Sequence, residues 1–236
     1  MKININDILF LDIETVPQCK TWEEVPIELQ SLFKDKTKYQ RKDEFTAKEF
    51  YDRAGIWSEF GKIICISVGY FKEIDGVNQL RVTSFYDEDE KQLLLNFKEL
   101  LDKHFNKPKY LLCAHNGKEF DFPFIARRMI INRIELPKKL NLFGKKPWEV
   151  PHLDTLELWK FGDYKHYTSL RLLTYILGIP SPKQDIDGSE VCNVYYNENN
   201  LPRIVEYCER DTIAVAQLLL RFNNMELIDE QNIVRV

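Results

Sequence analysis

The chain has 236 residues, of which 44% are hydrophobic and 13% aromatic, enough to bury a sizeable core. Its net charge of −4 excludes a general attraction for nucleic acid, so such binding would need local basic clusters. The five cysteines include no C-x-x-C pair, which argues against a disulfide framework or a zinc site. No apolar stretch is long enough for a signal peptide or a membrane span, so we expect a cytoplasmic protein.

The first half of the chain predicts three strands around a polar insertion. Residues 7–13 form a short apolar run, as a buried central strand would. Residues 17–60 are polar, and we interpret them as an insertion after this strand. Two helices are expected in it, near 26–37 and 46–54. Residues 62–71 and 80–85 then predict two antiparallel strands, with a turn at Asp75-Gly76.

Strands and helices alternate in the second half of the chain. We expect strands at 110–114 and near 148–153, a long polar loop at 178–198, and helices at 88–104, 122–132, 155–160, 168–177 and 202–223. Strands followed by this alternation predict an α/β fold, in which one mixed sheet of about five strands is flanked by helices. We expect residues 1–236 to form a single domain.

Basic residues gather in three clusters. Solvated surface charge is the commoner explanation for such clusters, and nucleic-acid binding is the alternative. The clusters are Lys34, Lys36, Lys38, Arg41 and Lys42, then Arg127 and Arg128, then Lys138, Lys139, Lys145 and Lys146.

Two acidic residues stand at the carboxyl end of the first predicted strand. Strand residues two apart share a face, so Asp12 and Glu14 emerge on the same side. A strand that has simply reached solvent would show the same pattern, and this is the commoner explanation for an arbitrary Asp-Ile-Glu. Open mixed sheets bind their ligands at strand carboxyl ends, so the position also fits an active site.

A third carboxylate, Asp121, follows a strand and an Asn-Gly turn, just before a predicted helix. A helix N-cap is the structural alternative for this residue. Asn116 would equally suit the turn, and Phe120 would suit apolar packing where the helix begins. Asp154 also precedes a predicted helix, and we interpret it as an N-cap outside the site.

The last predicted helix carries a fourth carboxylate, Asp211, on its apolar stripe. The other members of the stripe are Ile204, Cys208, Val215, Leu218 and Phe222. A buried carboxylate without a partner is strongly unfavourable, so something must compensate its charge. Tyr207 lies one turn earlier, beside Asp211. An ion pair with Arg210 is the alternative, although Arg210 points about 100° away around the helix.

Four carboxylates in one place would repel one another unless cations lay between them. Oxygen-only ligands select hard ions such as Mg²⁺ or Mn²⁺. If the fold brings Asp12, Glu14, Asp121 and Asp211 together, we expect a two-metal nuclease site.

Three patterns carry a family resemblance: Asp-x-Glu-Thr at Asp12, Asn-x-x-x-Phe-Asp at Asn116 and Tyr-x-x-x-Asp at Tyr207. In this order they resemble the exonuclease motifs of the DEDD superfamily. The tyrosine indicates its DEDDy branch, since the sister branch has histidine where this chain has Glu206. The wider sequence is similar to stand-alone bacterial proteins related to the proofreading exonuclease domain of family B DNA polymerases. Two further family patterns match at Ser169-Leu170-Arg171-Leu172-Leu173 and Lys183-Gln184-Asp185-Ile186.

The resemblance implies a ribonuclease H-like fold and 3′-5′ release of nucleoside monophosphates from single-stranded DNA. It implies two divalent cations, Mg²⁺ or Mn²⁺, held by Asp12, Glu14, Asp121 and Asp211, with Tyr207 orienting the attacking water. It implies that the terminal nucleotides contact Thr15, Asn116, Phe120, Ser169 and Lys183. We expect no polymerase domain in the chain. Two alternatives stay open, namely an exoribonuclease and a catalytically silent module that binds nucleic acid or a protein partner.

Overall fold

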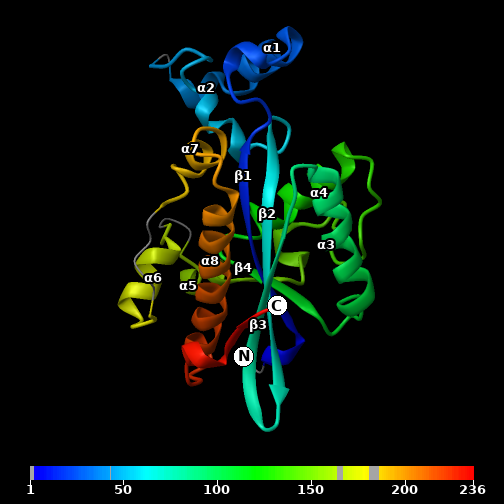
Figure 1. The fold of residues 1–236 in the computed structure, drawn as a ribbon, viewed down its shortest axis with the longest axis vertical. Helices are drawn as coiled ribbons and strands as arrows, with labels where there is room; N and C mark the ends of the chain where they lie inside the picture. The colour runs from blue at the N-terminus through cyan, green and yellow to red at the C-terminus, as the bar shows by residue number, and fades with distance from the viewer. Residues whose placement is uncertain (1–2, 43, 164–166, 181–185) are drawn as a thin grey trace.

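A mixed sheet forms the centre of the computed structural model, which describes residues 3–42, 44–163, 167–180 and 186–236. Within these residues the sheet has six strands, in the order β5-β4-β1-β2-β3-β6, and helices cover both of its faces (Figure 1). The predicted α/β class and the helix-flanked mixed sheet are therefore confirmed, and the arrangement is that of a ribonuclease H-like fold.

Strand β1 (Ile8–Pro17) lies between β2 (Gly61–Ile74), which is antiparallel to it, and β4 (Leu111–Ala114), which is parallel. Strand β2 turns into β3 (Val77–Tyr86) at Asp75 and Gly76, which both have positive φ, as a tight type I′ hairpin turn requires. Two short parallel strands complete the edges, β5 (Leu153–Asp154) beside β4 and β6 (Ile233–Arg235) beside β3.

The helices form one layer on each face of the sheet. Helices α3 (Glu90–His104) and α4 (Asp121–Ile131) cover one face. The other face carries α5 (Thr155–Lys160), α6 (Leu170–Ile176), α7 (Val191–Tyr196) and the long α8 (Leu201–Phe222). Short 3-10 helices span Ile5–Asp7, Trp22–Glu24, Tyr51–Ile56, Pro147–Glu149 and Glu230–Asn232. Among the described residues, no helix combines the length and apolarity needed to cross a bilayer.

Alternation along β1 decides where its acidic residues point. Leu9, Leu11 and Ile13 pack into the apolar cluster of α3 and α4. Ile8 and Phe10 pack with apolar residues of α8 on the opposite face. Because side chains alternate along a strand, the positions that follow Phe10 on its face, 12 and 14, point towards α8.

The predicted insertion holds helices α1 (Ile27–Lys36) and α2 (Lys38–Arg41), drawn in blue at the top of Figure 1. Its apolar cluster is centred on Phe33, whose ring contacts the rings of Trp22, Tyr51, Trp57 and Phe60. The helix expected near 46–54 is instead a series of turns followed by the 3-10 helix Tyr51–Ile56.

Three other elements differ from the sequence prediction. Strand β6 was not predicted, because three residues are too short to show alternation. Helix α7 lies inside the expected loop 178–198, where Val191 and Val194 are buried against other segments. Such a short helix depends on tertiary packing rather than on its own sequence. The strand expected near 148–153 is reduced to β5, preceded by the 3-10 helix Pro147–Glu149.

A buried ion pair fixes α4 to the rest of the fold. The Arg128 guanidinium donates to both carboxylate oxygens of Glu90, at 2.8 and 2.5 Å, and to the Ser58 carbonyl. Glu90 also accepts from the Ile63 backbone and from the Asn132 amide. The sequence analysis placed Arg128 in a basic cluster that was either solvated or nucleic-acid-binding, and for this residue the prediction was wrong. Its neighbours in space, which sequence does not reveal, make it a structural residue.

Replacing Arg128 by methionine should destabilise the fold strongly, because the Glu90 carboxylate would stay buried without its cation. We expect the free energy of unfolding, measured with urea, to fall by about 3–5 kcal/mol. The control is Lys98→Met, which removes a surface ion pair with Asp102 within α3 and should change stability by less than about 1 kcal/mol. Equal effects of the two substitutions would contradict this account.

Candidate active site

The structure brings together the four carboxylates that the sequence singled out. Asp12 and Glu14 lie on β1, Asp121 is the first residue of α4, and Asp211 lies in the middle of α8. Burial raises the pKa of the Asp12 carboxyl well above its usual value, and the charges of Glu14, Asp211 and Asp121 raise it further. All three acids therefore lie within electrostatic range of Asp12.

The carboxyl-terminal half of β1 is open on its β4 side, which gives Asp121 access. Pairing with β4 ends at Phe10 and Cys113, and the chain then turns away at Asn116, whose φ is 63°. The Asp121 carboxyl reaches back to β1, where hydrogen bonding to the Ile13 backbone favours its charged form. Burial dominates nevertheless, and it raises the pKa of Asp121 to about 7.

Glu14, the second acid of β1, is buried at 8% exposure, and a bulge follows it at Thr15. Burial raises the pKa of Glu14 well above its ordinary value. The charges of Asp211 and Asp121, among other groups, raise it further. Among the residues that the structure describes, no lysine or arginine pairs with Asp12, Glu14 or Asp121. No basic side chain of the described segments thus relieves the repulsion between these acids.

Tyr207 and Asp211 lie one helical turn apart and are hydrogen-bonded. Burial raises the pKa of Asp211 to about 6, while the Tyr207 hydroxyl and the Arg210 charge oppose this shift. Burial and the nearby charge of Asp211 raise the pKa of Tyr207 far above its usual value, so the phenol stays protonated at neutral pH. Arg210 also forms an ion pair with Glu206, at 2.6 Å.

Asp211 is half-buried, not fully buried as its place on the apolar stripe suggested. Ile204, Cys208, Val215 and Leu218 of the same stripe are buried. The difference arises because this part of α8 faces the other acids instead of the apolar core.

Cys208 is a neighbour of the acids that sequence reasoning missed. Its thiol lies 3.3 Å from both the backbone oxygen and the Oδ2 atom of Asp12, to which it donates. Burial raises the pKa of this thiol well above its usual value, so it remains a donor at neutral pH. One ligand atom each from Asp12, Glu14 and Cys208 lie within 4.8 Å of one another. The sequence did place Cys208 on the stripe of Asp211, which was the available signal.

Asp154 caps α5, as predicted, and also holds the turn that leads to Asp121. Its carboxylate accepts from the backbone N–H groups of Leu156 and Glu157 at the start of α5, at 2.9 and 3.2 Å. It also accepts from the N–H groups of Asn116 and Lys118, at 2.9 and 3.0 Å. Asp154 is therefore positioned to support Asp121 indirectly, a role that only the folded chain reveals.

The residues expected to contact nucleotides have structural partners of their own. The Thr15 hydroxyl donates to the Gly55 carbonyl at 2.8 Å, and Ser169 caps α6 by accepting from the Leu172 N–H. The Phe120 ring packs 5.3 Å from that of Phe124, and Asn116 forms the turn described above. Lys183 lies outside the described residues. Nucleotide contact by these residues stays a prediction.

The donor set suits a hard divalent cation. Glu14 and Asp121 are buried, whereas Asp12 and Asp211 are half-buried. All four offer carboxylate oxygens, which Mg²⁺ and Mn²⁺ prefer. A bound cation would offset both causes that raise these pKa values, chiefly burial and, for Asp12 and Glu14, also the repulsion between the acids.

One comparison with known families bears on this site. A family model described as "Predicted 3′-5′ exonuclease related to the exonuclease domain of PolB" matches residues 56–233. The match includes Asp121, Tyr207 and Asp211, whereas Asp12 and Glu14 precede it.

The metal-free protein should lose stability as pH rises between about 4 and about 7. Burial raises the pKa of Asp121 from 3.8 to about 7, so in this window the folded chain binds more protons than the unfolded chain and the free energy of unfolding falls. Thermal unfolding with EDTA should show this slope, and Asp121→Asn should flatten it.

Mn²⁺ should raise the melting temperature more at neutral than at acidic pH. An equal shift at both pH values would contradict a carboxylate metal site.

Asp154→Asn should weaken Mn²⁺ binding. In the unaltered protein four N–H groups donate to two carboxylate oxygens of Asp154, whereas an amide offers only one acceptor oxygen. We expect a loss of about 10–100-fold in affinity, measured by calorimetry. Asp89→Asn is the matched control, since Asp89 caps α3 and accepts from the Lys91 N–H far from the acids. If both variants bind Mn²⁺ like the unaltered protein, Asp154 supports only its own helix.

Proposed function

The chain belongs to the family of predicted 3′-5′ exonucleases related to the exonuclease domain of PolB, and we propose that it digests single-stranded DNA with two divalent metal ions. Family membership implies a nucleic-acid substrate and a general dependence on divalent metal. The observation that supports the two-metal proposal is the convergence of four carboxylates, of which Asp12, Glu14 and Asp121 have no basic partner in the described part of the chain. We assign Asp12, Glu14, Asp121 and Asp211 as the ligands.

Metal ions in such a site polarise the scissile phosphate and lower the pKa of the attacking water. Tyr207 would orient that water, because its hydroxyl already points to Asp211 and its raised pKa keeps the proton on the phenol. A protonated phenol is a hydrogen-bond donor and not a general base. We therefore assign Tyr207 a positioning role in catalysis.

Two observations favour the DEDDy type. Tyr207 lies one turn before Asp211 and shares a hydrogen bond with it. Glu206, at the position where the sister branch has histidine, is exposed and paired with Arg210. Position 206 therefore does not supply the histidine that the sister branch has.

We also infer that residues 1–236 act as one exonuclease domain, insertion included. The Thr15–Gly55 hydrogen bond ties the insertion to β1, and the Tyr196 hydroxyl of α7 donates to the Pro17 carbonyl at 2.6 Å. Five free cysteines, three of them buried, fit the reducing conditions of the cytoplasm. The likeness to a DNA polymerase domain favours DNA as substrate, with RNA as the alternative.

Digestion of a 5′-labelled single strand tests the proposal. With Mg²⁺ or Mn²⁺ we expect a ladder that shortens from the 3′ end, and with EDTA no shortening. Matched DNA and RNA strands identify the substrate, since faster loss of RNA would favour the exoribonuclease. Asp211→Asn should abolish the ladder while the circular dichroism spectrum is retained. Full activity of this variant would remove the proposed site.

Tyr207→Phe serves as the graded variant in the same assay. Loss of its hydroxyl should reduce the rate by about 10–100-fold, since the acids that hold the metal remain. Tyr175→Phe is the matched control, because Tyr175 is 83% exposed on α6. An unchanged rate in Tyr207→Phe would exclude the positioning role.

A further inference from the structure

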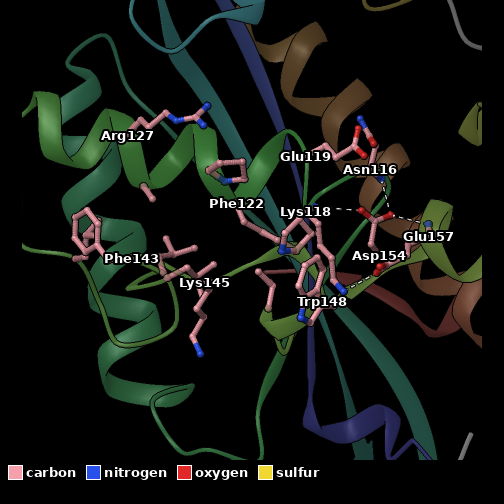
Figure 2. Close-up of a pocket in the computed structure, with 18 of the residues that line it drawn as sticks. Asn116, Lys118, Glu119, Phe122, Arg127, Phe143, Lys145, Trp148, Asp154 and Glu157 are labelled. Carbon is pink, nitrogen blue, oxygen red and sulfur yellow. Dashed lines mark hydrogen bonds and ion pairs between the residues drawn. The ribbon is translucent and has the colours of Figure 1, made fainter. Parts of the chain in front are cut away.

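A cavity of about 750 Å³ lies between α4, the segment 136–150 and the start of α5 (Figure 2). Its inner wall is apolar, formed by buried Phe122, Leu140 and Leu156 with partly buried Leu136. No function described above uses this cavity.

Two large aromatic side chains line the cavity while remaining exposed to solvent. Phe143 is 75% exposed and Trp148 is 73% exposed, and Figure 2 shows them at separate positions along the cavity. Exposed aromatic rings provide faces on which nucleotide bases stack, whatever the base sequence.

The same cavity carries a surplus of positive charge. Arg127, Lys145 and Lys160 line it, and among the described residues none of the three has an ion pair. Of the acids present, Asp154 is bound by four N–H groups and Glu157 by Lys118 at 2.5 Å, which leaves Glu119. Arg127 and Lys145 are also members of the basic clusters noted in the sequence.

The cavity adjoins the acidic site through a shared turn. Asn116, Lys118 and Glu119 line the cavity, and the turn they form ends at Asp121. A strand with its 3′ end at the carboxylates therefore needs only to cross this turn to enter the cavity.

We propose that this cavity binds nucleotides upstream of the 3′ end of a single strand, with bases against Trp148 and Phe143 and phosphates near Arg127 and Lys145. The inference rests on the proposed function and adds to it a second contact region. Single-stranded nucleic acid combines apolar base faces with regularly spaced anions, which matches the combination of exposed rings and basic side chains here. An acidic, apolar peptide is the competing occupant.

Two substrates separate the cavity from the acidic site. The p-nitrophenyl ester of thymidine 5′-monophosphate reaches only the acidic site, whereas a single strand of about 15 nucleotides reaches both. Trp148→Ala should raise the KM for the long strand at least about fivefold and leave hydrolysis of the ester unchanged. Trp148→Phe should restore the KM, because it keeps an aromatic face.

Charge is tested with the double variant Arg127→Ala, Lys145→Ala, whose matched control is the exposed Lys72→Ala on β2. Loss of two phosphate contacts should make the slope of log affinity against log salt shallower by about 1.4. Affinity is measured by the fluorescence anisotropy of the labelled strand in EDTA, so it does not depend on hydrolysis.

The possible outcomes distinguish this inference from the proposed function. A protein that cleaves both substrates but keeps its KM in Trp148→Ala would overturn the inference and leave the nuclease intact. A protein that cleaves neither, yet loses strand affinity in both sets of cavity variants, would overturn the nuclease and support the cavity. Unchanged strand affinity in these variants would overturn the inference. The acidic, apolar peptide would then be the remaining candidate for the cavity.

Discussion

Mutual repulsion between carboxylates around the middle of β1 is the constraint on which the site depends. Asp12 and Glu14 continue a face whose earlier positions, Ile8 and Phe10, are packed in the core. Burial and neighbouring charge raise their pKa values together, as expected where like charges share a poorly hydrated space. The fold tolerates this arrangement because the surrounding helices are fixed by interactions that do not involve the acids.

Those interactions surround the site on several sides. The Glu90–Arg128 pair holds α4, and with it Asp121, against β2 and the insertion. Asp154 holds the turn before α4 by two backbone N–H groups. Apolar packing of α8 on the sheet fixes the position of Asp211 relative to β1. A metal site needs such supporting contacts, because ligands that move freely bind cations weakly.

The local periodicities of the sequence predicted most of the strands and helices that carry the site. Alternation placed Asp12 and Glu14 on one face of a strand, and the helical period placed Tyr207 beside Asp211. The contacts that sequence could not predict join segments far apart in the chain. Cys208 meets Asp12, and Arg128 meets Glu90, only after the sheet and helices have packed. The short strand β6 and helix α7 were missed for the same reason, since packing determines them.

Diffraction from crystals soaked in Mn²⁺ would test the central claim most directly. Anomalous difference density should show two peaks about 4 Å apart, bounded by the side chains of Asp12, Glu14, Asp121 and Asp211. Density at other acids alone, or none between these four at saturating Mn²⁺, would contradict the claim that they form a metal centre.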